Sequence, residues 1–290
     1  MYKLLDWIDT TKIFWASLCV NPRAIHLLEQ HPDNIDYVML SRNPNAIHLL
    51  TQNLDKICWI KLSENPGAIH ILEKNLDKVC WIRFSENPGA IRILEQHPEK
   101  INWISLSINT MATNILEQNL EQNPDKIFWT WLSRNSGAIR LLEQNPDKIN
   151  WSIMSQNPGA INMLEQNPDK IDWAWLSLNY KAIHLLEKNQ DKLFWPWLSK
   201  NPAAIHFLEQ NKEKIDWFSL SENTGAIQLL EQNKDKIDWF SLSKNPAIFT
   251  LDYAWLENRM NIIKEELLSV ALHPDRIQSW LEQGRNIEDL

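Results

Sequence analysis

The sequence predicts an all-α fold, an α-solenoid of short two-helix repeats closed by helical caps. The first sign is an asparagine that recurs every 22 residues, with one interval of 26, at Asn21, Asn43, Asn65, Asn87, Asn109, Asn135, Asn157, Asn179, Asn201, Asn223 and Asn245. The second is the shared text N-P-x-A-I-x-L-L-E-Q-N-P-D-K-I-x-W-x-x-L-S-x, numbered here as positions 1 to 22. A fixed period of this size indicates stacked units, because one unit alone buries too little apolar surface to fold.

The first half of each unit has the features of a helix. Asn at position 1 is a favoured N-cap residue, and Pro at position 2 suits the first helical turn. Apolar residues at positions 4, 5, 7 and 8 share one helical face, which leaves positions 3, 6, 9 and 10 facing outward. Asn-Pro at positions 11 and 12, as in Asn145-Pro146, predicts the end of this helix.

The second half predicts a further short helix, with Asp at position 13 as its cap and Ile, Trp and Leu at positions 15, 17 and 20. Positions 15 and 17 point to nearly opposite sides of a helix, so this helix is either enclosed by neighbours or begins late. The alternative architecture is a leucine-rich-repeat-like solenoid, which I-x-W-x-x-L-S-x-N partly resembles. Helical pairs are favoured because position 18 includes Pro196, a poor strand residue.

Breaks in the period predict three parts. Residues 1–20 are expected to form an N-terminal cap and half repeat, residues 21–249 the tandem repeats, and residues 250–290 a C-terminal helical cap. The irregular unit 109–134 contains LEQNLEQN, and four inserted residues are about one helical turn, so its first helix should be longer. We expect the stack to be an open rod or arc.

A column of tryptophans occupies position 17, with Tyr37 standing in once. We interpret it as structural, joining each unit to the next, rather than as a stacking platform for bases or a cofactor. Its members are Trp15, Trp59, Trp81, Trp103, Trp129, Trp151, Trp173, Trp195, Trp217 and Trp239. Trp131, Trp175 and Trp197 at position 19 are less regular, and the sequence leaves their exposure open.

Composition and motifs argue against several classes of function. The chain of 290 residues is 44% hydrophobic and has a formal net charge of −8, which does not favour nonspecific attraction to nucleic acid or anionic lipid. It has no apolar run long enough for a membrane span, and three cysteines, an odd number, fit a reducing compartment. These two features predict a cytoplasmic protein. No catalytic, metal-binding or nucleotide-binding motif is present, so we predict a protein without catalytic residues, metal or cofactor.

Tandem NPxAIxLLE/DKIxW units resemble those of repeat proteins of large DNA viruses that infect amoebae and algae. The tail EELLSVALHPDRIQSWLEQG, residues 265–284, is similar to tails on such proteins, so the resemblance covers nearly the whole chain. It implies a viral protein that acts in the host cytoplasm, the virus factory or the virion. It implies no catalytic residues.

Variable surface positions suggest where a partner binds. We predict a noncatalytic scaffold that binds another protein, host or viral, through position 6: His26, His48, His70, Arg92, Asn114, Arg140, Asn162, His184, His206 and Gln228. The alternative is single-stranded nucleic acid bound along the repeat face by position 6 together with the lysines of position 14: Lys56, Lys78, Lys100, Lys126, Lys148, Lys170, Lys192, Lys214 and Lys236. A third hypothesis is a structural component of the virion.

Overall fold

The computed structural model describes residues 1–283, which belong to two compact units. One unit is Asp6–Ile248, and the other joins Met1–Leu5 with the described residues from Phe249 onward, 249–283. The predicted all-α repeat architecture is confirmed, because short helices recur along the whole of Asp6–Ile248. The leucine-rich-repeat alternative is not supported, since the repeats contain no strand within the described residues.

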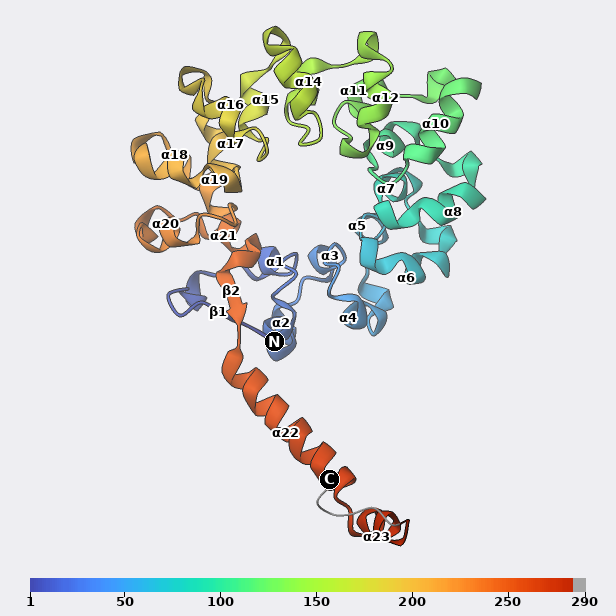
Figure 1. Cartoon of the computed structure of the whole chain (residues 1–290), viewed down its shortest axis with the longest axis vertical. Helices are drawn as coiled ribbons and strands as arrows, with labels where there is room; N and C mark the ends of the chain where they lie inside the picture. Colours follow the sequence, from blue (N-terminus) through green and yellow to red (C-terminus); the bar gives the residue numbers. More distant parts are fainter. Residues whose placement is uncertain (284–290) are drawn as a thin grey trace. The chain divides into compact units, whose positions relative to one another are not determined.

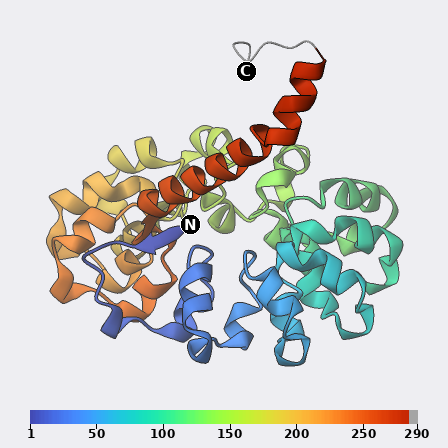
Figure 2. The ribbon, with the colours of Figure 1, turned by 90° about the horizontal axis from the view of Figure 1, so that it is seen from below.

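The unit Asp6–Ile248 has two layers of helices (Figure 1). The inner layer holds the helices that begin at position 17: α1 (Trp15–Leu18), α3 (Tyr37–Leu40), α5 (Trp59–Leu62), α7 (Trp81–Glu86), α9 (Trp103–Ile108), α11 (Trp129–Leu132), α13 (Trp151–Ser155), α15 (Trp173–Ser177), α17 (Trp195–Lys200), α19 (Trp217–Ser221) and α21 (Trp239–Lys244). The outer layer holds the helices of the first half: α2 (Ile25–Gln30), α4 (Ile47–Thr51), α6 (Ile69–Glu73), α8 (Ile91–Gln96), α10 (Thr113–Gln122), α12 (Ile139–Glu143), α14 (Ile161–Gln166), α16 (Ile183–Glu187), α18 (Ile205–Gln210) and α20 (Ile227–Glu231). Figure 2 shows the chain turned by 90° and seen from below.

Short 3-10 turns lead into the helices of both layers. Those before inner helices are η1 (Thr10–Lys12), η2 (Pro32–Asn34), η3 (Leu54–Lys56), η5 (Leu76–Lys78), η7 (Pro98–Lys100), η8 (Pro124–Lys126), η10 (Pro146–Lys148), η11 (Pro168–Lys170), η12 (Gln190–Lys192), η14 (Lys212–Lys214) and η15 (Lys234–Lys236). Those after the recurring asparagine are η4 (Pro66–Ala68), η6 (Pro88–Ala90), η9 (Ser136–Ala138), η13 (Pro202–Ala204) and η16 (Pro246–Ile248).

The core lies between the two layers. Leu at position 8 of the outer helix and the apolar residue at position 20 of the inner helix are fully buried, as Leu208 and Leu220 illustrate. Ala at position 4, such as Ala204, is also fully buried, where a larger side chain would separate the layers. Each repeat therefore supplies at least one large apolar side chain from each layer to a continuous core.

The inner helix begins late, which decides between the two interpretations left open by the sequence. Ile215 at position 15 is extended, with φ −66° and ψ 128°, and Asp216 caps α19 by accepting a hydrogen bond of 2.8 Å from the amide of Ser219. The prediction that position 13 caps this helix is wrong, since Glu213 lies within the preceding 3-10 turn. Because Ile215 is extended, its side chain points into the core before the helix starts.

Asparagine at position 1 connects each repeat to the preceding one. Asn223 donates from Nδ2 to the carbonyls of Ser199 at 2.9 Å and Asn201 at 3.0 Å, while its Oδ1 accepts from the amide of Gly225 at 2.9 Å. One buried side chain thus caps its own turn and joins two repeats. Aspartate has no such donor, which explains why the position requires Asn.

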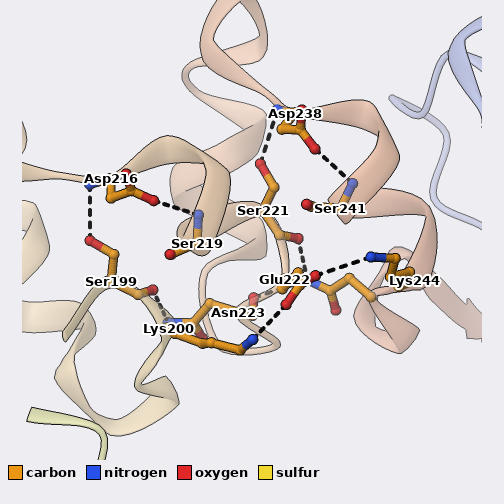
Figure 3. Close-up of polar contacts among 11 residues, drawn as sticks. Ser199, Lys200, Asp216, Ser219, Ser221, Glu222, Asn223, Asp238, Ser241 and Lys244 are labelled. Atoms are coloured by element: carbon orange, nitrogen blue, oxygen red, sulfur yellow. Dashed lines mark hydrogen bonds and ion pairs between the residues drawn. The ribbon is translucent and has the colours of Figure 1, made fainter. Parts of the chain in front are cut away.

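Serine at position 21 makes a second connection, shown in Figure 3. The hydroxyl of Ser221 donates to the carbonyl of Trp217 at 2.7 Å and accepts from the amide of Asp238, in the next repeat, at 3.0 Å. Ser199 and Asp216 repeat the contact one repeat earlier at 3.0 Å. The recurring KIDWFSLS text therefore encodes an interface between copies of itself.

The stack closes on itself, so the expectation of an open rod or arc is wrong. Asn21 donates to the carbonyls of Ser243 at 3.2 Å and Asn245 at 3.0 Å, the same two acceptors that other repeats supply. The amide of Phe14 donates to Ser243 Oγ at 3.0 Å, and helices α1 and α21 pack side by side. Residues 6–248 therefore form a ring whose seam copies the internal interfaces (Figure 1).

The irregular unit 109–134 is accommodated without breaking the ring. Its helix α10 has 10 residues where neighbouring outer helices have 5 or 6, which confirms the predicted lengthening. Asn135 still bonds the carbonyls of Ser107 at 3.0 Å and Asn109 at 2.9 Å across the insertion. The added turn extends the outer layer and leaves the connection between repeats intact.

The second unit contains a two-stranded sheet and two longer helices. Strands β1 (Tyr2–Leu4) and β2 (Phe249–Leu251) pair antiparallel, with Lys3 opposite Thr250. They are followed by α22 (Tyr253–Ala271) and α23 (Pro274–Glu282).

Within residues 1–283, none of the helices combines the length and the apolarity that crossing a bilayer demands.

Candidate functional site

The aromatic column of position 17 is half-buried between consecutive repeats. Lysines of position 14 cover many of its rings, each lying 4.5 to 5.3 Å from the ring centre of the preceding repeat, as in Lys78 over Trp59 and Lys170 over Trp151. The same contact crosses the seam, where Lys12 lies over Trp239. These lysines therefore hold a structural contact that the sequence did not reveal.

The predicted partner-binding residues of position 6 lie on the outer helices. All of them are exposed except His26, which is half-buried. Several contact the Glu at position 9 of the preceding repeat: His48 with Glu29 at 2.8 Å, Arg92 with Glu73 at 2.6 Å, His184 with Glu165 at 2.7 Å and His206 with Glu187 at 3.4 Å. Part of this row thus lies in contacts between repeats.

A different apolar surface lies on the inner helices. Position 18 lies about 200° around the helix from the buried position 20, so its side chains point away from the core. Large exposed residues occupy it at Val38, Ile60, Ile82, Ile104, Phe218 and Phe240. Between them the position is occupied by smaller or polar residues: Thr130, Ser152, Ala174 and Pro196.

Two arcs of the ring therefore differ, and we name them by their inner helices. In the first arc, residues 37–108, position 18 is large and position 19 carries Met39, Lys61, Arg83 and Ser105. In the second arc, residues 129–200, position 18 is small and position 19 carries Trp131, Ile153, Trp175 and Trp197. In the second arc the large apolar side chain therefore lies one residue later than in the first arc, which is about 100° further around the helix.

The second arc contains an open hollow of about 600 Å³, which we call the aromatic hollow. It is lined by Arg134, Gln156, Pro158, Trp175, Leu178, Trp197 and Lys200. The rings of Trp175 and Trp197 are in contact, with centroids 4.4 Å apart, and Phe194 packs edge-on against Trp197 at 5.1 Å. Trp131, at position 19 two repeats before Trp175, is not among the lining residues and is 39% exposed.

Charged groups flank this hollow. Lys200 pairs with Glu222 at 2.7 Å, and Lys244 contacts the same carboxylate at 3.4 Å (Figure 3). Partial burial raises the pKa of Glu222, but the hydrogen bond and charge of Lys200, with Lys244, outweigh it and leave that pKa below its usual value. Arg134 has no ion pair among the described side chains, so the hollow presents a positive edge.

The first arc has a smaller hollow, in which the charged side chains pair with one another. A hollow of about 220 Å³ is lined by Arg42, Glu64, Arg83, Glu86 and Asn87. Glu64 pairs with Arg42 at 2.8 Å and with Arg83 at 3.2 Å. Opposite charges satisfy each other there, and no aromatic ring lines the hollow.

The described residues contain no cluster of three or more His, Cys, Asp or Glu side chains that could hold a metal ion. The cysteines are free thiols. Cys19 stands where other repeats have serine, and its sulfur accepts from the amide of Asp36 at 3.3 Å. Burial raises the pKa of the Cys19 thiol, which makes it a poor nucleophile at neutral pH.

Sequence reasoning singled out position 6 and missed the aromatic hollow. The signal was present in Trp131, Trp175 and Trp197, whose irregular placement marks where position 19 becomes aromatic. What was missing was the knowledge that these side chains, with those of position 22, meet across neighbouring repeats.

Comparisons with known proteins find no match: no family model fits the chain, and no curated protein or solved structure is detectably similar to it. The resemblance to repeat proteins of large DNA viruses therefore stays a prediction.

Proposed function

We propose that this protein is a noncatalytic ring scaffold that binds another protein, and that the aromatic hollow is the main contact. The supporting observation is the pair of touching indoles, Trp175 and Trp197, in an open hollow beside Arg134 and Lys200. Tryptophan and arginine are the residues most enriched at the energetic centres of protein interfaces. The positive edge favours a partner segment that carries both apolar and acidic side chains.

The frame of the ring suits this role. Repeating Asn and Ser contacts fix the backbone, so surface residues at positions 18, 19 and 22 vary without altering the fold. The row at position 6 is a second candidate surface on the outer layer. We rank it lower because His48, Arg92 and His184 already contact glutamates of neighbouring repeats.

The sequence resemblance extends the proposal to place of action. A viral repeat protein of this kind acts in the host cytoplasm, the virus factory or the virion. A stoichiometric amount of the chain in purified particles would favour the structural virion role. Mass spectrometry of such particles measures this directly.

The test of the main proposal is affinity purification with quantitative mass spectrometry. The variant Trp175→Ala/Trp197→Ala should lose bound protein by about tenfold or more, because truncating central aromatic residues removes most interface energy. The matched control is Ile60→Ala/Ile82→Ala, which removes exposed apolar side chains from the first arc and should retain the partner. Equal retention by both variants contradicts the proposal.

Single-stranded nucleic acid is the second candidate, since indoles beside cations also stack bases. Here the lysines of position 14 offer little support, because many lie against aromatic rings. A retention assay with labelled single-stranded RNA or DNA decides the matter. Tight binding that falls steeply with salt and is lost in Trp175→Ala/Trp197→Ala would replace the protein partner with nucleic acid.

A further inference from the structure

Helix α22 (Tyr253–Ala271) has many apolar residues and buries none of them. Tyr253 is 70% exposed, Met260 64%, Leu267 65% and Val270 62%. A helix of this length is marginal in water without tertiary packing, and an exposed apolar row of this size marks an interaction surface.

Six of the apolar residues follow the spacing of a coiled coil, while Trp255, Ile262 and Leu268 lie outside it. Steps of three and four residues alternate along a single stripe through Tyr253, Leu256, Met260, Ile263, Leu267 and Val270. This is an unbroken a/d pattern over almost three heptads, in which every position is apolar. An open hollow of about 490 Å³ lies along the same stripe, between Met260, Ile263 and Leu267.

Charges beside the stripe select the direction of a partner helix. Glu257 and Lys264 occupy one flank, and Arg259 and Glu266 the other. In a parallel pair of α22 helices, Arg259 would face Lys264 of the second copy, and Asp252 would face Glu257. Both contacts bring like charges together.

In an antiparallel pair the same flanks become complementary. Residues of one flank then face the same flank of the other helix, so Arg259 meets Glu266 and Glu257 meets Lys264, each twice by symmetry. The apolar stripe falls in the same register, which sets Tyr253 against Val270, Leu256 against Leu267, and Met260 against Ile263. Core and flanks thus agree on a single register without any adjustment.

We infer that α22 is a self-association helix that pairs antiparallel with α22 of a second copy of this chain. A second copy fits because the helix is complementary to itself in both apolar spacing and charge, as a two-fold symmetric interface requires. This inference does not depend on the proposed function of the ring. Pairing two chains also gives the assembly two aromatic hollows, which strengthens binding to a multivalent partner.

Light scattering coupled to size-exclusion chromatography, and sedimentation equilibrium, test the pairing on the full chain. The wild type should show a concentration-dependent dimer, and Leu267→Asp should be monomeric at the same concentrations. Ile262→Asp is the matched control, because Ile262 lies on the same helix outside the stripe and is 39% exposed. Circular dichroism verifies that both variants keep the ring folded.

Charge reversal tests the direction. R259E faces Glu266 in the antiparallel pair and should weaken the dimer by about tenfold, whereas in a parallel pair it would face Lys264 and strengthen it. The double variant R259E/E266R should recover wild-type affinity. A chain that is monomeric at all concentrations, a dimer that survives Leu267→Asp, or one that R259E strengthens overturns the inference.

Discussion

The two arcs of the ring share one frame and display different surfaces. In both, asparagine at position 1 and serine at position 21 make the same bonds, as Asn65 and Asn179 show. The first arc exposes aliphatic side chains at position 18 and pairs its charges around Glu64. The second gathers tryptophans at position 19 around the aromatic hollow. A repeat can therefore keep its interfaces while moving its exposed apolar side chain by one residue.

The common frame predicts equal, large losses when the asparagine is removed from either arc. Asn65→Ala and Asn179→Ala each delete a capping acceptor and remove the side-chain donor that bonds two buried carbonyls. One of the two, that of Asn43 or Asn157, still accepts a hydrogen bond from a backbone amide, so each variant leaves one serine carbonyl without its donor. We expect each to lower the free energy of unfolding by about 3 kcal/mol, measured by urea denaturation. Asn162→Ala, at an exposed position, serves as control and should change it little. A loss confined to one arc would show that the frame is not shared.

The different surfaces predict unequal losses at positions 18 and 19. Trp197→Ala removes a half-buried ring that contacts Trp175 and Phe194, and should cost about 2 kcal/mol. Ile82→Ala in the first arc should cost less than about 0.5 kcal/mol, because Ile82 is 56% exposed and faces away from the core. Thermal denaturation of the two variants compares them, and equal losses would contradict the distinction between the arcs.

The cation–π contacts should stabilise the protein equally in the first arc, in the second arc and at the seam. Lys78→Met, Lys192→Met and Lys12→Met each remove one ammonium from an aromatic ring. We expect each to lower the free energy of unfolding by about 0.5 to 1 kcal/mol, with the apolar stem retained by methionine. A markedly smaller effect of Lys12→Met than of the other two would show that the seam is looser than the interfaces it copies.

Acid should weaken the ion pair between Glu222 and Lys200, the residue at the end of the second arc. Its lowered pKa means that the ionised carboxylate stabilises the fold above its unfolded pKa, and that this contribution is lost as the pH falls through the folded value. Glu222→Gln should therefore lower the melting temperature slightly at pH 7 and not at all in strong acid. The control is Glu209→Gln, an exposed carboxylate of an outer helix. A constant difference between wild type and Glu222→Gln at every pH would rule out this account.

Much of the fold could be predicted because its determinants are local. The period and the lengthened helix of residues 109–134 depend on residues close together in the sequence and are present in the structure. Asn223 caps as predicted, but it caps the turn that leads into α20, and the helix itself begins only at Ile227. The cap at position 13 was predicted wrongly because the chain first turns Ile215 into the core, a choice made by packing with the other layer. The lysines of position 14 were misjudged for a similar reason, since their aromatic partners lie a whole repeat away.

The candidate site was less predictable than the fold. Position 6 was chosen because its residues vary. Variation indicates that the side chains are exposed, but it does not predict whether they line a hollow. The aromatic hollow requires side chains from four successive repeats, Arg134, Gln156, Trp175 and Trp197, to face one another. Their approach depends on how steeply the inner layer curves.

Sequence alone determined the repeating helices and the residues that join them, because capping and hydrogen bonding act within one repeat and its neighbour. Closure was decided by tertiary structure. Each repeat is rotated slightly relative to the preceding one, and over residues 6–248 these rotations bring Asn21 to Ser243 and Asn245. The sequence of a single repeat does not predict that total rotation. The same curvature brings the tryptophans of the second arc together, so both the ring and its hollow are products of many equal interfaces.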